Sequence, residues 1–564
     1  MDPATPAPET PPLSAGAGRR PSWRDWVGPW KGPASLVQAA ALLLALVNVW
    51  FGPLNQDEGW YLLAAQNVGR GMMPYRDFFF SQGPVLPYVY HVADVASGGF
   101  GVLGGRAFTA LLGYLAAFFF ALSAGELARR REPAAFGPAF LVAFALTAFS
   151  PDWAYFAAIP KTYALGALFL SLGFALALGA PGRSNGRTCA FAGAFFALAA
   201  ATRATLCIAA VPVWIALLAI ARRDRARRFD WLWFAVGCSV ALAAVYVPVF
   251  VLAGDNFLFS QTFHAAREAA PFKQWLLLRA GFASLLAQGY PALVAAAAIL
   301  AAAKSHGLMV AWSDGRKAGP SDHPTIRPSA PLYWAVVASF ALLTLAHFLV
   351  PFPYADYNTP AMPLAAVALA VPLGRLVARA NLRPWRVGLA VLAASVLFVA
   401  GSPWPMKWVG GEQDRFWFKA DTDSALAKLR RAGRLVRELN PDGKPILTQD
   451  AYLAVEAGCP VVAGLEVGPF SVFPDLSDDE ARRRRVHNVA TLEEAVRACD
   501  ADVAALSGYS FAIACPSTAP LPEDDREKLL AAVRDRFGEP VFEEPRFGQF
   551  GTKLELFSRK KSTP

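Results

Sequence analysis

The stretch Asn55-Gln56-Asp57-Glu58-Gly59-Trp60-Tyr61 follows directly on the apolar run SLVQAAALLLALVNVWFG at residues 35–52. That run is about as long as the 20 residues needed to cross the hydrocarbon core of a bilayer. The chain therefore leaves an apolar helix and at once presents two adjacent carboxylates. Asn is a preferred helix N-cap, and acidic side chains are favoured in the first turn of a helix. The pattern predicts a helix over 57–68 at the membrane surface, with Asp57 and Glu58 in its first turn.

Similar apolar segments recur through the first 400 residues. The 564-residue chain is 55% hydrophobic and only 17% charged, whereas about a quarter of the residues are charged in typical soluble domains. These segments hold few charges except at their ends, as transmembrane helices do. The sequence predicts an all-α polytopic membrane domain over 34–401 with about eleven spans, at 34–52, 104–125, 134–150, 160–180, 188–201, 204–221, 231–253, 281–303, 331–350, 359–378 and 387–401.

Lys and Arg are distributed unevenly between the loops on the two sides of these spans. Most of them lie on the N-terminal side, for example in "ARRR" and "ARRDRARR". The positive-inside rule therefore places residues 1–33, which are rich in Pro, Ala and Gly, in the cytoplasm as a disordered segment. An odd number of spans then places residues 402–564 outside a plasma or inner membrane. The net charge of +10 belongs to the membrane part, so it needs no nucleic-acid partner.

The C-terminal residues 402–564 read as a soluble extracytoplasmic α/β domain. Helical spacing occurs in "SALAKLRRAGRLVREL", "TLEEAVRAC" and "DREKLLAAVRDRF", and short strands are expected at "PILTQD", "DVAALSG" and "TKLELFSR". The domain contains no Gly-rich phosphate loop, zinc-ligand spacing or nucleophile elbow. We expect it to be an accessory or acceptor-guiding domain.

Several polar residues are predicted on the same side of the membrane as Asp57. The carboxylate of Asp57 can act as a general base, although two acids at a helix N-terminus can also be purely structural. Single cations at span ends are often interface residues, but several together can form an anion pocket, such as one for phosphate. The candidates in the first external loop (53–103) and beyond it are Tyr75, Arg76, Asp77, Arg106, Asp152, Lys161 and Arg203.

The segment NQDEGWYLLAAQNVGRGMMPYRDFFFSQGPVLPYVYHVA at 55–93 resembles the first external loop of the GT-C membrane glycosyltransferases. The likeness is to the protein O-mannosyltransferase and aminoarabinose-transferase branch and its bacterial relatives. An acidic pair, a Gly-x-x-Pro-Tyr-Arg-Asp segment, a Pro and an Arg early in the second span are all present. "LAAATRAT" (198–205) and "YADYNTPAMPLAAVALA" (354–370), which contains Tyr357, are similar to later motifs of the family.

The resemblance implies an inverting transferase of sugar from a polyprenyl-phosphate donor to a lipid, glycan or protein acceptor. Asp57 would be the base, Glu58 would orient it or a nearby group, and the cations would bind the leaving phosphate. Two positions depart from the family pattern. Lys161 stands where an acid often opens the fourth span, and Asp356 stands where an Arg often precedes the late Tyr. No metal or other cofactor is predicted to be required.

Two other functions are compatible with these residues. A transporter or flippase of a lipid-linked glycan would also need the cations and the hydrophobic bulk, but it should place ionisable residues near the middle of spans and show repeat symmetry. An inactive scaffold of the same fold is the second alternative.

Overall fold

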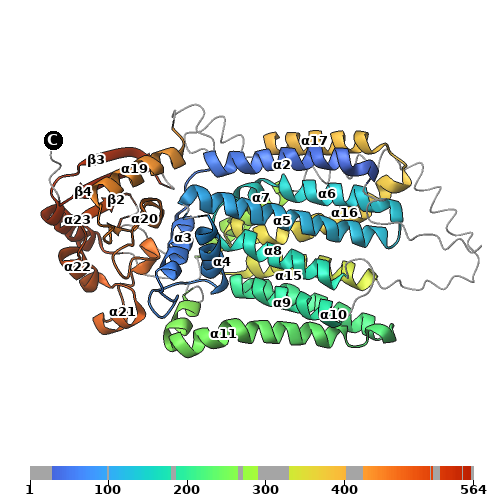
Figure 1. The fold of residues 1–564 in the computed structure, drawn as a ribbon, viewed down its shortest axis with the longest axis horizontal. Helices are drawn as coiled ribbons and strands as arrows, with labels where there is room; N and C mark the ends of the chain where they lie inside the picture. The colour runs from blue at the N-terminus through green and yellow to red at the C-terminus, as the bar shows by residue number, and fades with distance from the viewer. Residues whose placement is uncertain are drawn as a thin grey trace, which may run out of the picture.

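The computed structural model describes residues 28–97, 99, 101–178, 186–263, 271–289, 329–401, 423–508, 510–511, 521–548 and 551–559. Its long helices run side by side in one bundle, and a smaller domain with a sheet lies at one end of that bundle (Figure 1). The N-terminal part contains η1 (Gly28–Trp30), α2 (Lys31–Phe51), α3 (Gln56–Gly69), α4 (Val85–Ala96), α5 (Val102–Arg129), η2 (Pro133–Ala135), α6 (Phe136–Ala148), α7 (Pro151–Phe156), α8 (Thr162–Ala177), α9 (Gly186–Thr202), η3 (Ala204–Ala209), α10 (Ala210–Ala221), η4 (Arg225–Arg227), α11 (Asp230–Thr262), α12 (Phe272–Gly289), α15 (Ser329–Leu349), η5 (Ala355–Ala361), α16 (Met362–Arg379) and α17 (Pro384–Gly401).

The bundle is built from the apolar segments that the sequence predicts to be spans. Ten of the eleven expected segments form helices here, and the eleventh, 281–303, begins in α12 but lies mostly outside the described residues. Within the described part, six helices are long and apolar enough to cross a membrane: Gly28–Phe51, Val102–Arg129, Ala204–Ala221, Arg225–Thr262, Ala330–Leu349 and Asp356–Arg379. Four others are shorter, so the chain is a multi-pass membrane protein and the number eleven stays a prediction.

Small residues let the helices of the bundle approach closely. A Cβ at Gly193 of α9 would lie 2.0 Å from the carbonyl oxygen of Phe234, and one at Gly237 of α11 would lie 1.9 Å from that of Ala190. Such contacts are typical of membrane helices, whose association depends on close packing because lipid is as apolar as their side chains. The predicted break between α9 and α10 is present at Arg203, which has extended backbone angles.

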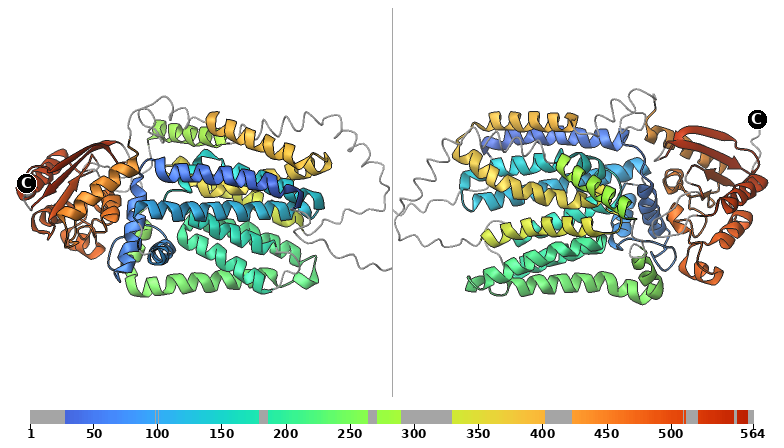
Figure 2. Two further views of the ribbon diagram at one scale, coloured as in Figure 1. Left: turned by 45° about the horizontal axis from the view of Figure 1, so that its top comes forward. Right: turned by 180° about the vertical axis from the view of Figure 1, so that it is seen from behind.

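Helices α3 and α4 lie across the end of the bundle, between it and the C-terminal domain (Figure 2). α3 corresponds to the helix that the sequence predicts over 57–68. The C-terminal domain lies at the same end as this loop, whereas the first turn of α2 lies at the opposite end. Which end faces the cytoplasm stays a prediction from the distribution of Lys and Arg.

The C-terminal domain contains a four-stranded mixed sheet in the order β1-β2-β4-β3. β1 pairs with β2 in parallel, and the other two pairs are antiparallel. Helix α19 turns the apolar positions Leu426, Leu429 and Val436 into the core. The elements are α19 (Ala425–Leu439), β1 (Leu447–Thr448), α20 (Ala451–Ala457), η6 (Gly468–Ser471), α21 (Asp478–Arg484), α22 (Val489–Ala498), β2 (Val503–Leu506), α23 (Glu523–Phe537), β3 (Phe542–Phe547) and β4 (Thr552–Ser558).

The sequence predicts six of these ten elements. It does not predict β3, because Pro545 interrupts the strand and the pairing with β4 is irregular between Glu544 and Phe547. Proline is confined to edge strands and bulges in sheets, and β3 is an edge strand. α20, η6 and α21 are each seven residues or fewer, which is too short for periodicity to indicate a helix.

Candidate active site

The first turn of α3 is fixed by a capping box. The Asn55 side chain accepts a hydrogen bond from the Asp57 amide at 3.1 Å, and Glu58 Oε1 accepts one from the Asn55 amide at 2.8 Å. Asn55 has extended backbone angles, as an N-cap residue should. The predicted N-cap is therefore present, and it orients the two carboxylates differently.

Glu58 faces Arg106 of α5 in a fully buried ion pair. Arg106 Nε lies 2.7 Å from Glu58 Oε2, and Arg106 Nη2 lies 2.7 Å from Glu58 Oε1. The remaining guanidinium donors bond to the carbonyl oxygens of Val49, Gly52 and Pro53 at 2.7–3.2 Å. The pair thus joins α3 to the end of α2 and to α5. The ion pair therefore has a structural role, and it engages the charged groups of both side chains.

Asp57 points the other way, toward Lys161 at the start of α8. Lys161 Nζ lies 2.8 Å from Asp57 Oδ2 and 2.9 Å from Asp356 Oδ2 in η5. The Tyr163 hydroxyl donates a further hydrogen bond to Asp356 Oδ2 at 2.8 Å. The Asp57 side chain is 28% exposed, whereas that of Lys161 is 6% exposed. One buried ammonium therefore forms ion pairs with two carboxylates, those of Asp57 and Asp356. The side chain of Asp57 is the more exposed of the two.

Arg203 lies beside this group, between two tyrosine rings. Its guanidinium carbon is 4.9 Å from the ring centres of both Tyr163 and Tyr357, within the range of a cation–π contact. Nη1 reaches Thr162 Oγ1 at 3.4 Å, and Nε is buried and has no hydrogen-bond partner among the described residues. Among the described residues, no carboxylate lies within ion-pair distance of Arg203. Its guanidinium group is therefore able to bind an anion.

His347 of α15 contacts both η3 and Tyr357. The histidine is fully buried, with Nε2 3.1 Å from Thr205 Oγ1. Its ring centre lies 6.3 Å from that of Tyr357. We call the set Asp57, Lys161, Tyr163, Arg203, Asp356 and Tyr357 the polar cluster.

The remaining predicted residues lie elsewhere. Tyr75 is buried with a positive φ of 69°, and its hydroxyl donates to the carbonyl of Gln82. Arg76 and Asp77 form an ion pair at 2.6 Å at the surface, and Asp77 accepts a hydrogen bond from the Met73 amide at 2.7 Å. These three residues build a turn of the first loop, and Asp77 closes it.

Asp152 is buried in the first turn of α7, a helix that contacts α2 and η5. The structure therefore brings together Asp57, Lys161, Arg203 and Tyr357 of the predicted site residues. It adds two: Asp356, which the sequence marks only as a departure from a pattern, and Tyr163, two residues after Lys161. Apolar periodicity cannot show that Lys161 and Asp356 meet, since they lie 195 residues apart.

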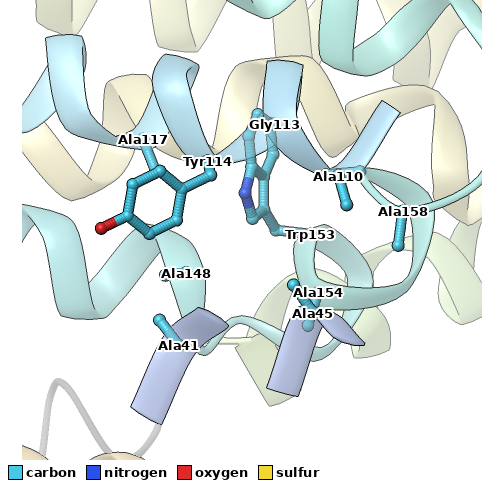
Figure 3. A pocket seen from close by; sticks show the side chains of 11 residues that line it. Ala41, Ala45, Ala110, Gly113, Tyr114, Ala117, Ala148, Trp153, Ala154 and Ala158 are labelled. Carbon is cyan, nitrogen blue, oxygen red and sulfur yellow. The ribbon is translucent and has the colours of Figure 1, made fainter. Parts of the chain in front are cut away.

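A small cavity lies between α2, α5 and α7 (Figure 3). Its volume is about 30 Å³, room for roughly one water molecule. Alanines and Gly113 form most of its wall, with Tyr114 and Trp153 as the large side chains. None of the residues of the polar cluster lines it.

No group of three or more His, Cys, Asp or Glu side chains suited to a metal occurs among the described residues. That no metal is required stays a prediction from the sequence.

Solved structures with a similar fold exist. The crystal structure of ArnT from Cupriavidus metallidurans bound to undecaprenyl phosphate matches 96% of this chain and 100% of its own, with a TM-score of 0.54 and 13% identity. The structure of the same protein in the apo state matches 95% of this chain and 99% of its own, with a TM-score of 0.55 and 14% identity. The chain has the GT-C fold. No protein-family model matches the sequence, and no curated protein matches it significantly.

The likeness confirms the fold that the sequence resemblance predicts: a polytopic helical domain followed by a C-terminal α/β domain. At this level of identity it extends to the fold alone. The likeness therefore concerns the arrangement of the helices, and the chemistry depends on the polar cluster.

Proposed function

We propose that this protein is a membrane glycosyltransferase that moves a sugar from a polyprenyl-phosphate donor to an acceptor hydroxyl, with inversion at the anomeric carbon. Asp57 is the general base, and Lys161 and Arg203 bind the donor phosphate. The acceptor is a lipid, a glycan or a protein, and the reaction takes place on the extracytoplasmic face.

The observation that carries the proposal is the position of Lys161. Its ammonium lies between Asp57 and Asp356, and Arg203 stands on the adjacent Tyr163 ring. A base and two cations thus meet at the end of the bundle, where helices α3 and α4 cross it. A donor with a long lipid tail suits that place, because its tail can stay in the bilayer while its phosphate reaches the cluster.

In the absence of donor, the carboxylate of Asp57 is engaged in the ion pair with Lys161 at 2.8 Å. A donor phosphate would compete with Asp57 for the ammonium. Binding of the donor would then release Asp57 from Lys161, so that its carboxylate can take the proton of an acceptor hydroxyl. Asp356 keeps hold of Lys161 meanwhile, so the ammonium stays in the site.

The chemical step follows from these positions. The acceptor oxygen attacks the anomeric carbon from the face opposite the phosphate while its proton passes to Asp57. The bond between the anomeric carbon and the phosphate oxygen breaks, and its electron pair leaves with the phosphate. Negative charge grows on that leaving group, so the cations Lys161 and Arg203 stabilise the transition state more than the ground state.

The proposal is tested with purified protein in liposomes, radiolabelled polyprenyl-phosphate sugars and a membrane extract as the acceptor source. We expect wild type to transfer label and Arg203→Gln to bind donor about tenfold more weakly. Asp94→Asn, a carboxylate of α4 outside the cluster, serves as the control with unchanged transfer. Movement of lipid-linked sugar across the bilayer without transfer would instead establish the transporter. Folded protein that neither binds nor consumes any such donor would end the proposal.

A further inference from the structure

The C-terminal domain is joined to the helix that carries Asp57 along the full length of that helix. Two side chains of α3 and that of its C-cap residue donate hydrogen bonds to backbone carbonyls of the segment 449–458, which contains α20. Gln56 Nε2 reaches the Gln449 oxygen at 2.8 Å, Gln66 Nε2 reaches that of Val455 at 3.3 Å, and Arg70 Nη2 reaches that of Gly458 at 3.3 Å. The domain is therefore bound to α3 by specific polar contacts.

The backbones of the two helices also touch. A Cβ at Gly59 would lie 2.2 Å from the Tyr452 nitrogen and 2.8 Å from the Ala451 carbonyl carbon. Any side chain at position 59 must push α20 away, because backbone atoms cannot move aside as a flexible side chain can. Trp60 adds an aromatic contact to Phe470 of η6, with ring centres 5.3 Å apart.

Gln449 is itself held firmly within the domain. Its Oε1 accepts a hydrogen bond from the Phe511 amide at 2.7 Å, and its Nε2 reaches the carbonyl oxygen of Gly468 at 3.4 Å. The side chain thus connects the end of β1 to two other segments, while its carbonyl binds Gln56. Both Gln56 and Gln449 are buried.

We propose that Gln449, through its bond to Gln56, is a positioning element for Asp57, so that the C-terminal domain completes the active site without contacting substrate. Gln56 directly precedes Asp57, and Glu58 directly follows it. The first turn of α3 is therefore held from the bundle side by Arg106 and from the domain side by Gln449. Asp57 lies between these two attachments, with its carboxylate directed at Lys161.

This inference rests on the proposed role of Asp57 as the base. A shift of the base by about 1 Å can cost about a hundredfold in rate without changing substrate affinity. Loss of the Gln56 bond should therefore act on kcat, while Lys161 and Arg203, which belong to other elements, continue to bind the donor.

The test compares Gln56→Leu with Gln66→Leu, which removes a bond of the same kind from the far end of the same helix. We expect Gln56→Leu to lower kcat by about 10- to 100-fold with donor affinity within about threefold of wild type, and Gln66→Leu to change both by less than threefold. Gly59→Leu should lower kcat further. An unchanged kcat in Gln56→Leu, an equal loss in both variants, or a loss of donor affinity in parallel would overturn the proposal.

Hydrogen exchange of the peptide containing residues 56–60 gives a second readout that needs no donor. We expect faster exchange in Gln56→Leu than in Gln66→Leu at equal thermal stability. Equal exchange in the two variants would overturn the positioning role. If wild type transfers no sugar while this difference in exchange is seen, the proposed function fails but the attachment of Asp57 to the domain stands.

Discussion

Lys161 and Asp356 are 195 residues apart in the chain, yet the lysine Nζ lies 2.9 Å from Asp356 Oδ2. The same ammonium lies 2.8 Å from Asp57. Asp356 is thus the second carboxylate of the polar cluster, whereas the candidate Asp152 is buried in α7. The two carboxylates compete for one cation, so a change at either should affect the other.

Asp356→Asn keeps the size of the side chain and an acceptor for Tyr163 but removes one negative charge. The cluster becomes more attractive to phosphate, and Lys161 is left to pair with Asp57 alone. We expect donor affinity to rise roughly tenfold, about 1.4 kcal/mol, while transfer slows because Asp356 no longer fixes the Lys161 ammonium in the site. Equilibrium binding and single-turnover transfer measure the two effects separately. Weaker donor binding in this variant would contradict the competition.

The buried ion pair between Glu58 and Arg106 should contribute to the stability of the protein. Breaking a buried ion pair by removing one partner costs about 3–5 kcal/mol, since the other charge is left buried and uncompensated. We expect Glu58→Gln and Arg106→Met each to lower the unfolding temperature in detergent strongly. The double variant should lose less than the sum of the two. Additive losses would show that the two groups do not depend on each other.

The C-terminal domain should show a pH-dependent stability that comes from Glu466. Burial raises the pKa of this carboxyl to about 7 from its usual 4.5, against the bond that it accepts from the Gly464 amide at 2.9 Å. The folded state thus favours the protonated acid, so its contribution is fully present below about pH 4.5 and is lost as the pH rises through 7. The loss is on the order of 3 kcal/mol.

Glu466→Gln cannot ionise, so it should remove this part of the pH dependence. Comparing the variant with wild type between pH 4.5 and 8 cancels the contributions of other groups, including His487, whose pKa burial lowers. Resistance of the domain to proteolysis is a suitable measure. We expect the stability of the variant relative to wild type to increase as the pH rises. A constant difference in stability across this range would contradict the prediction.

Local sequence patterns predict most of the elements and the start of the candidate site. Ten of the apolar segments, the N-cap Asn55 and the break at Arg203 are determined by neighbouring residues, and they are present as predicted. Contacts between distant residues are not accessible in this way. Sequence grouped Arg106 with Lys161 and Arg203 as cations on one side of the membrane. Only the fold shows that Arg106 is enclosed with Glu58.

The structural role of the Tyr75-Arg76-Asp77 segment is likewise visible only in the fold. Together with the acidic pair it carries the family resemblance of the first loop. The structure shows it as a turn in which Asp77 accepts a hydrogen bond from the Met73 amide and Tyr75 is buried with a positive φ. A recurrent motif can therefore mark a loop shape as well as a binding group. The attachment of α3 to Gln449 depends on residues almost 400 positions apart, and no local pattern indicates it.

The central claim is that Asp57 is the base, and Asp57→Asn tests it most directly. The amide keeps the shape and the capping of α3 but cannot take a proton. With labelled polyprenyl-phosphate sugar in liposomes, we predict that the variant binds donor at least as well as wild type. Its transfer should be slower by about 10²- to 10⁴-fold, the usual contribution of a general base. Transfer at the wild-type rate would show that Asp57 only shapes the helix start and that another group removes the proton.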